Sequence, residues 1–242
     1  MLIVKVKDFL FDNDRVIIYQ DNDYFKFSVD SVLLANFVSI NLRDRKIMDL
    51  ACGNAPIPML LTFKTKALIY GVELQKEIYD LAVESVKENK MDKQIHLICD
   101  DVKNIYDKFD SDMFDIVTCN PPYFKENGKM INSNMVKCLA RHEVSLNLED
   151  ILKVSKKILK NGGKLSIVHS SNRLIEIITL FKKYNIEPKK LQFVYPKSGK
   201  DSHIILIEGV KNGRPGLKVL SPLIIYDKDG NYNKDILKMF KG

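Results

Sequence analysis

The stretch KIMDLACGNAPIPMLLTFKTKALIYGVEL, residues 46–74, begins and ends with short apolar runs, and each run predicts a buried strand. Predicted helices and strands alternate along the chain from this point. The amphipathic stretch from Gln75 to about Lys90 predicts a helix, and two more apolar runs predict strands at 95–99 and 114–119. Such alternation is typical of an α/β fold, a mostly parallel sheet with helices on both faces.

The second half of the chain continues this pattern and then changes it. It predicts, in order, a helix at 146–163 closed by Gly162 and Gly163, a strand at 164–169, a helix at 172–184, and strands at 190–196 and 202–210. The last two strands are separated only by a short loop, so we expect them to pair antiparallel. The result is a seven-stranded, mostly parallel sheet whose last strand is antiparallel.

We predict one domain over residues 1–242, with a cover at 1–40, a core at 41–210, and a tail at 211–242 that packs on the core. The tail looks irregular, with room for one added strand. In the cover, RVIIYQDNDYFKFSVD (15–30) predicts a hairpin whose turn is DND. Either Ser28 or Asp30 is expected to cap the helix that follows.

Composition narrows the class of protein. No apolar run reaches the roughly 20 residues of a bilayer-spanning helix, and the opening MLIVKVKDFLF makes a poor signal peptide. Widely spaced cysteines without a CxxC pair predict reduced, mostly buried thiols of a cytoplasmic protein rather than disulfides or zinc ligands. These are Cys52, Cys99, Cys119 and Cys138. We therefore expect no membrane partner and no metal.

The net charge of +7 is unevenly distributed. Residues 1–150 carry 19 Lys and Arg against 24 Asp and Glu, whereas residues 151–242 carry 19 against 7. A basic second half favours a polyanionic partner, with nucleic acid the first candidate. A lysine-rich solvated surface explains the same charge about equally well, so both interpretations stay open.

The stretch DIVTCNPPYF, residues 115–124, contains a strand that ends in an Asn-Pro-Pro-Tyr corner. Two prolines remove two backbone N–H groups and fix the chain, which leaves free carbonyls beside the Asn120 amide. An acceptor-rich corner beside aromatic rings suits a flat molecule that bears an NH₂ group. The alternative is a plain strand-ending turn.

Acidic residues follow the other strands, and ligands of such sheets bind at the carboxyl ends of the strands. Asp49 and Gly53 follow the first strand, and Glu73, 24 residues after Asp49, ends the second, where it suits both hydroxyls of a ribose. The loop ACGNAP lacks the GxGxxG that a dinucleotide pyrophosphate needs, and Asp49 would repel phosphate. A cationic adenosine compound, S-adenosylmethionine, fits better.

Several segments together resemble one known family, the bacterial tRNA1(Val) adenine-N6 methyltransferases, over about Phe9 to Asp235. They are FKFSVDSVLLANF, DLACGNAPIP, NPPYF, ARHE and YPKSGKDSHIILIEGVKNGRPGLKVLSPLIIYDKDGNY. The resemblance implies a Rossmann-like class I methyltransferase fold, S-adenosylmethionine as cofactor, and N6-methylation of an adenine in tRNA, A37 of tRNA1(Val). One departure is Ala51 and Ala55 in a loop that is usually richer in glycine, which leaves a weaker cofactor affinity open.

The resemblance also implies roles for individual residues. Cofactor binding is assigned to Asp49 and Gly53 at the methionine end, Glu73 at the ribose, and Leu74 and Asp101 at the adenine, with Phe27 and Asp30 approaching from the cover. Asn120 is assigned to cofactor binding as well as to catalysis. Asp100 is the alternative to Asp101. Catalysis is assigned to the corner of Asn120, Pro121, Pro122 and Tyr123, in which the Asn120 oxygen and the Pro121 carbonyl accept the N6 hydrogens.

Substrate contacts are assigned to four residues. Tyr123 or Phe124 supplies a stacking surface for the flipped base, and Lys197 and Lys200 contact tRNA. The polar stretch 125–134 is interpreted as a lid over the site, and His142 as structural. Two further functions use the same corner, adenine-N6 methylation of rRNA and N5-methylation of a protein glutamine. A non-catalytic RNA-binding module is the least favoured reading.

Overall fold

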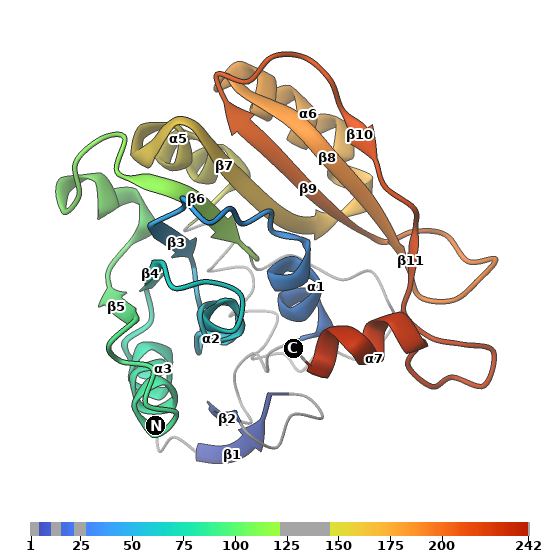
Figure 1. Cartoon of the computed structure of the whole chain (residues 1–242), viewed down its shortest axis with the longest axis horizontal. Coiled ribbons are helices and arrows are strands. Elements are labelled where there is room, and N and C mark those ends of the chain that lie inside the picture. The colour runs from blue at the N-terminus through green and yellow to red at the C-terminus, as the bar shows by residue number, and fades with distance from the viewer. Residues whose placement is uncertain (1–4, 11–15, 22–27, 122–145, 242) are drawn as a thin grey trace.

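The computed structural model describes residues 5–10, 16–21, 28–121 and 146–241. Nine strands of this part form one sheet, shown in Figure 1. They are β3 (Lys46–Leu50), β4 (Leu68–Glu73), β5 (Ile95–Cys99), β6 (Phe114–Cys119), β7 (Leu159–Ser170), β8 (Ile186–Tyr195), β9 (Ile204–Lys211), β10 (Lys218–Val219) and β11 (Leu223–Ile224). The strand order is β10-β8-β9-β7-β6-β3-β4-β5, and β11 also pairs with β8.

Strand β9 is antiparallel to both of its neighbours, and every other pair in this sheet is parallel. The predicted seven-stranded sheet with an antiparallel last strand is therefore confirmed, and β10 and β11 add two short strands from the tail. Strand β3 lies between β4 and β6, so the strand order reverses beside it. A ligand is expected at that reversal.

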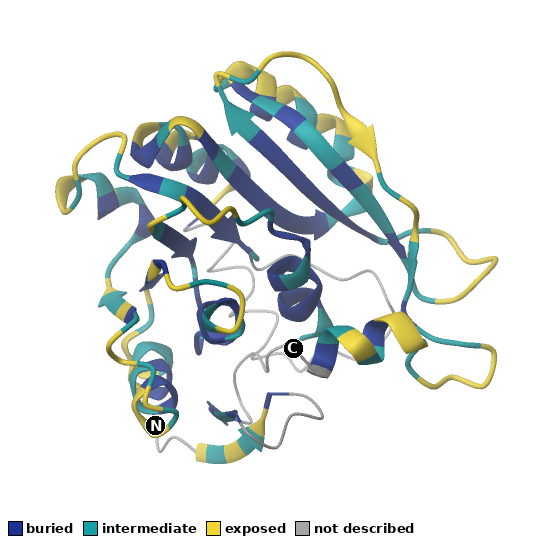
Figure 2. Cartoon of the chain, in the orientation of Figure 1, coloured by how far each residue is buried: buried dark blue, intermediate teal, exposed yellow. Residues whose placement is uncertain are grey.

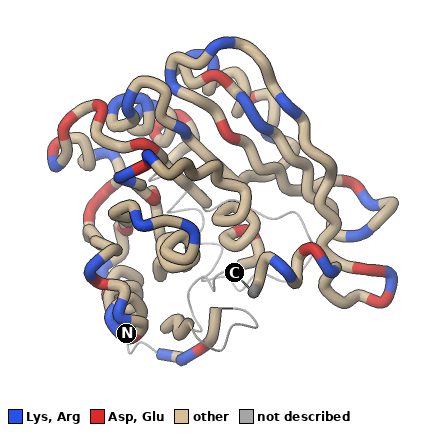
Figure 3. Tube along the Cα trace, viewed as in Figure 1, with Lys and Arg blue, Asp and Glu red and all other residues tan. Residues whose placement is uncertain are grey.

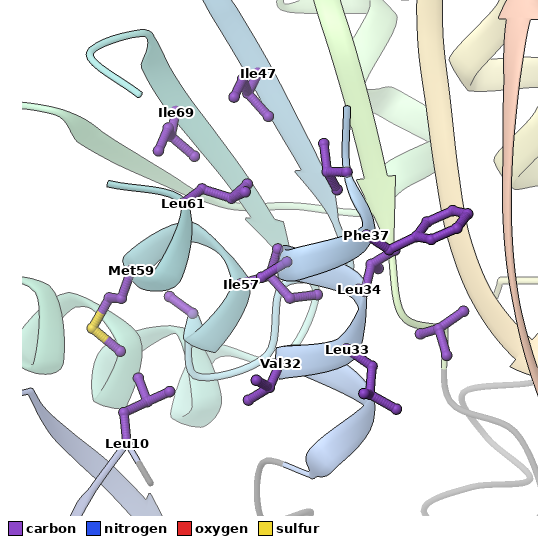
Figure 4. Close-up of a cluster of buried hydrophobic side chains, with 14 of the residues drawn as sticks. Leu10, Val32, Leu33, Leu34, Phe37, Ile47, Ile57, Met59, Leu61 and Ile69 are labelled. Carbon is purple, nitrogen blue, oxygen red and sulfur yellow. The ribbon is translucent and has the colours of Figure 1, made fainter. Parts of the chain in front are cut away.

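Helices cover both faces of the sheet, and each layer buries its own apolar cluster. One face carries α1 (Val29–Phe37), α2 (Pro56–Thr62), α3 (Lys76–Glu88) and α7 (Lys234–Lys241), and the other carries α5 (Leu148–Ile158), α6 (Leu174–Lys183) and the 3₁₀ helix η1 (Val102–Asp107). A second 3₁₀ turn, η2 (Ser171–Arg173), precedes α6. Figure 2 shows the central strands as the most buried part, and Figure 4 shows Leu34 of α1 and Ile57 of α2 in the first cluster with Ile47 and Ile69.

The glycine pair predicted to close the helix at 146–163 has a different role. Helix α5 ends at Ile158, and both glycines lie inside β7. The pairing of β7 with β6 shifts register here, and Gly162 has a φ of 78°. A Cβ on Gly163 would lie 2.9 Å from the Lys160 carbonyl oxygen. The two glycines therefore permit an irregular strand instead of ending a helix.

The amino-terminal segment contains a strand pairing that the sequence did not predict. Strand β2 (Ile17–Asp21) pairs antiparallel with β1 (Lys5–Phe9), while most of the predicted turn and second strand lies outside the described residues. Strand β2 then docks on α3 through side chains. The Asn89 amide accepts from the Ile17 backbone N–H at 2.9 Å and donates to the Ile17 carbonyl at 2.6 Å, in place of a neighbouring strand. Ser28 occupies the N-cap position of α1, without a side-chain cap bond.

Within the described residues, no helix combines the length and apolar character needed to cross a bilayer. No group of three or more His, Cys, Asp or Glu side chains in the same residues has the arrangement of a metal site. Cys52 and Cys119 are buried free thiols, as predicted, whereas Cys99 is exposed because β5 is an edge strand. Cys138 lies outside the described residues.

Candidate active site

The predicted acids and the Asn-Pro corner meet at the carboxyl edge of four adjacent strands. Leu50 pairs with Val72 on one side and with Cys119 on the other, so the residues that follow β3 lie level with Glu73 and Asn120. Glu73 in turn pairs with Cys99, which precedes Asp100. With strands about 4.8 Å apart, the row from β5 to β6 spans about 14 Å, enough for an elongated ligand.

The loop after β3 has an unusual backbone. Ala51, Gly53 and Ala55 have φ values of 54°, 57° and 66°, in the left-handed region that favours glycine. Three hydrogen bonds hold this course: the Cys52 N–H donates to the Val72 carbonyl at 2.8 Å, the Ala55 N–H to the Cys52 carbonyl at 3.0 Å, and the Gly53 N–H to Glu73 at 3.0 Å. The loop thus keeps a glycine-like shape despite its two alanines.

Asp49 is fully buried in β3, directly before this loop. Its Oδ1 accepts a hydrogen bond from the Thr118 hydroxyl at 2.6 Å, whereas its Oδ2 meets no donor among the described residues. Burial raises the pKa of Asp49 to about 8, helped by the charge of Glu73 and opposed by the Thr118 hydrogen bond. An orphan buried carboxylate oxygen fits a cationic ligand, which would supply the missing donor and charge.

Glu73 ends β4 and is also nearly buried. Its Oε2 accepts from the Gly53 N–H at 3.0 Å, and its Oε1 accepts from the Gln75 N–H at 2.9 Å. Burial raises its pKa, while these backbone N–H groups and that of Leu74 oppose the rise. Each carboxylate oxygen keeps a second lone pair, so two more donors can bind. The Leu74 side chain beside it is 44% exposed, an apolar surface at the edge of the site.

The two acids after β5 differ in how strongly local contacts engage them. Asp100 accepts from the Asn104 amide at 3.1 Å and pairs with Lys108 at 2.9 Å, and these contacts lower its pKa. Asp101 accepts from the Lys103 N–H at 2.8 Å as the cap of η1, and its Oδ2 is 3.4 Å from the Lys103 ammonium. Asp101 therefore retains the more available oxygen.

Asn120 is the first residue after β6 and is half-buried, with Pro121 buried behind it. Its Nδ2 donates to the Ser31 hydroxyl at 3.2 Å, across 89 residues of sequence. Sequence reasoning selected Asp30, which is buried in the first turn of α1, but missed Ser31 beside it. The only available signal was the position of Ser31 inside the segment FKFSVDSVLLANF.

The remaining predicted residues are not all in the described part. Phe27, Pro122, Tyr123, Phe124, the stretch 125–134 and His142 lie outside it. Figure 3 shows the lysines and arginines in blue along the described trace. Lys197 and Lys200 are exposed in the loop between β8 and β9. Because β8 runs parallel to β7, this loop lies at the same edge as the site, three strands away from β6.

Known proteins resemble this chain in sequence and in fold. A tRNA1(Val) (adenine(37)-N6)-methyltransferase from Aliivibrio salmonicida is 26% identical over 213 residues, covering 88% of this chain and 87% of the relative. A predicted O-methyltransferase from Agrobacterium tumefaciens superposes with a TM-score of 0.71 at 21% identity, covering 88% and 97% of the two chains. These matches extend over most of the chain.

A second solved structure shares the fold at lower similarity. It is a geranyl diphosphate C-methyltransferase from Streptomyces coelicolor in complex with S-adenosyl-L-homocysteine, with a TM-score of 0.57 at 12% identity, covering 75% of this chain and 79% of the other. The sequence profile of the methyltransferase small domain matches residues 26–194, which include the carboxyl ends of β3, β4, β5 and β6. The chain belongs to the methyltransferase small domain family.

Proposed function

We propose that this protein transfers the methyl group of S-adenosylmethionine to N6 of an adenine in tRNA. The observation that carries the proposal is the position of the Asn120 amide at the end of β6, beside the strands β3 and β4 that carry the buried acids Asp49 and Glu73. The Asp49 Oδ2 has no hydrogen-bond partner among the described residues. The relative from Aliivibrio salmonicida supports A37 of tRNA1(Val) as the target.

The order of strands suggests how the cofactor lies along the edge. Asp101 after β5 and the exposed Leu74 would hold the adenine, and Glu73 with its two spare lone pairs would bind the ribose. Asp49 at the end of β3 and Gly53 in the loop after it would hold the cationic methionine end, together with Asp30 of α1. This order brings the sulfonium end closest to β6, where Asn120 lies. Phe27 is proposed as a further contact.

When bound, S-adenosylmethionine supplies an activated methyl group on a sulfonium. The lone pair of an adenine amino group is delocalised into the ring, so the protein must orient it. The Asn120 Oδ1 and the Pro121 carbonyl would accept the two N6 hydrogens, which polarises N6 and aims its lone pair away from the corner. Pro122 would fix the corner, and Tyr123 or Phe124 would stack on the extruded base.

The basic second half of the chain supports an RNA substrate. Lys197 and Lys200 follow β8, which ends at the same edge of the sheet as the site but about three strand spacings, or about 14 Å, from β6. At that distance they would contact phosphates of the tRNA body rather than the reacting base. Adenine in rRNA and a protein glutamine remain alternative acceptors for the same corner, although a protein substrate does not require a basic surface.

The proposal is tested by incubating the protein with labelled S-adenosylmethionine and separate pools of unmodified tRNA, rRNA, DNA and protein. Digestion and mass spectrometry then identify the methylated residue. We expect N6-methyladenosine from the tRNA pool alone, and at A37 when purified tRNA1(Val) is used. Label in rRNA or in protein glutamine, with none in tRNA, would replace the proposed substrate by one of the alternatives.

A further inference from the structure

The orientation of the Asn120 amide decides whether the corner can work. A carboxamide has a donor end and an acceptor end, and only the oxygen can accept a hydrogen from N6. Asn120 donates through Nδ2 to the Ser31 hydroxyl at 3.2 Å, so its Oδ1 is turned away from α1. In the opposite orientation the Asn120 Nδ2 would face the adenine N6. Both groups are hydrogen-bond donors, so no hydrogen bond would form between them.

Ser31 is itself held firmly. It is 3% exposed in the first turn of α1, and its N–H donates to the Ser28 carbonyl at 3.0 Å. The other end of α1 is attached to the sheet by a group that we name the anchor cluster. It consists of Ser39, Lys164, Ser166, Lys190 and Glu208.

The anchor cluster ties the end of α1 to three strands. The Ser39 N–H and the Ser166 hydroxyl both donate to Glu208 at 2.8 Å, which links the helix to β7 and β9. The Lys190 ammonium of β8 donates to the Ser39 hydroxyl at 2.7 Å. A helix fixed in this way at one end gives Ser31 a defined position at the other.

From this geometry we infer that Ser31 is a positioning residue that holds the Asn120 side chain in its orientation for methyl transfer, an inference that rests on the proposed function. Ser31 acts through Asn120 and contributes no group to the reacting atoms. Loss of its hydroxyl releases the amide to rotate, so part of the enzyme would present the wrong end to N6.

The test is a double-mutant cycle in single-turnover methylation of purified tRNA. Ser31→Ala is expected to slow the wild-type enzyme by roughly 3- to 10-fold, the factor that matches one ordinary hydrogen bond. In the Asn120→Ala background the same change should slow the reaction less than about twofold, because the amide is already absent. The Kd for S-adenosylmethionine and the KM for tRNA should not change.

Further variants separate positioning from folding. Ser31→Thr keeps the hydroxyl and should restore the rate, whereas Ser31→Cys keeps the size with a weak hydrogen-bonding group and should stay slow. Ser155→Ala is the matched control. Ser155 is fully buried in α5 on the opposite face, and its hydroxyl has no hydrogen-bond partner among the described residues. Thermal melting identifies any variant that has not folded.

Two results would overturn the inference: an unchanged rate for folded Ser31→Ala, or equal slowing in both backgrounds. Failure of the proposed function looks different. In that case the wild type makes no N6-methyladenosine in tRNA, or Asn120→Ala alone keeps a near-native rate, whatever Ser31→Ala does.

Discussion

Two buried carboxylates point to the same face of the sheet, and their surroundings differ. Glu208 follows Ile207, and Asp49 lies between Met48 and Leu50, all three in the cluster on the α5 side, so both acids point to the face that carries α1 and α2. Glu208 accepts two hydrogen bonds and has the Lys190 ammonium 3.6 Å away. Among the described residues, Asp49 has a single hydrogen-bond partner, Thr118, and its Oδ2 has none.

This difference separates a structural acid from a ligand-binding one. A buried carboxylate is costly unless it is paired, and at Glu208 the protein supplies the partners itself. At Asp49 the fold leaves the carboxylate incomplete, and the raised pKa of about 8 is the result. Changes at the site end should therefore alter catalysis or binding more than stability, and changes at the anchor cluster should do the reverse.

The largest effect is expected at the site end, from Asn120→Ala. It removes an acceptor used mainly in the transition state, so single-turnover methylation should fall by about 10²–10³-fold, with folding and cofactor affinity intact. Tyr123→Phe, which keeps the ring, serves as a mild comparison. A near-native rate for Asn120→Ala would show that the Asn-Pro-Pro-Tyr segment is only a strand-ending turn. The contrast between the site end and the anchor cluster would then no longer hold.

Glu208→Ala should give the converse result. It leaves the Ser39 N–H and the Ser166 hydroxyl without their acceptor and the Lys190 ammonium without its counter-ion, although Lys190 keeps its bond to the Ser39 hydroxyl. The free energy of unfolding should fall by about 2–3 kcal/mol, since Lys190 is partly exposed. Urea unfolding measures this loss, and Glu208→Gln should lose less because it keeps an acceptor. An unchanged urea midpoint for Glu208→Ala would show that the anchor cluster adds nothing to stability.

Asp49→Asn should change the pH dependence of stability. The folded pKa of about 8 exceeds the ordinary 3.8, so between pH 4 and 8 the folded protein holds a proton that the unfolded chain loses. Wild-type stability should therefore fall with rising pH, by up to about 1.4 kcal/mol per unit, relative to Asp49→Asn. Urea unfolding at pH 5, 6.5 and 8 without cofactor measures the difference between the two proteins.

The same proton links pH to cofactor binding. A cationic ligand favours the ionised carboxylate, so affinity for S-adenosylmethionine should rise with pH up to about 8 in the wild type. Calorimetry in buffers of different ionisation enthalpy should detect a released proton, and Asn at position 49 should abolish both this release and most of the binding. If stability and cofactor affinity changed with pH in parallel for the wild type and Asp49→Asn, Asp49 would already be ionised across this pH range.

The smallest effect is expected far from the corner. If about four phosphates are neutralised, log K for tRNA should fall with log salt at a slope near −3. Replacing Lys197 and Lys200 by Ala should flatten the slope by about 1 for each contact, with unchanged cofactor affinity. Lys87→Ala, at an exposed position near the end of α3, is the matched control. An identical salt slope for the wild type, the variant without Lys197 and Lys200, and the Lys87→Ala control would mean that tRNA contacts another surface of the protein.

Sequence alone predicted the strands of the core and the acids at their ends, because hydrophobic periodicity is local and each acid lies within two residues of the end of its strand. It missed the Ser31–Asn120 contact, which joins positions 89 residues apart. It misassigned Gly162 and Gly163 because a glycine pair suits a helix end and an irregular strand equally well. The partner of β2 was missed for a similar reason, since several nearby runs have strand-like composition.

The left-handed alanines after β3 have a consequence for how such loops are recognised. Each costs roughly 1–2 kcal/mol in that conformation, so contacts with Val72 and Glu73, and not local preference, must maintain the shape. A motif search that counts glycines would pass over this chain, whereas a comparison of backbone angles would retain it. Ala51→Gly and Ala55→Gly would also give the loop the glycine content that such motif searches expect, and both glycines could adopt the backbone angles that the loop already has.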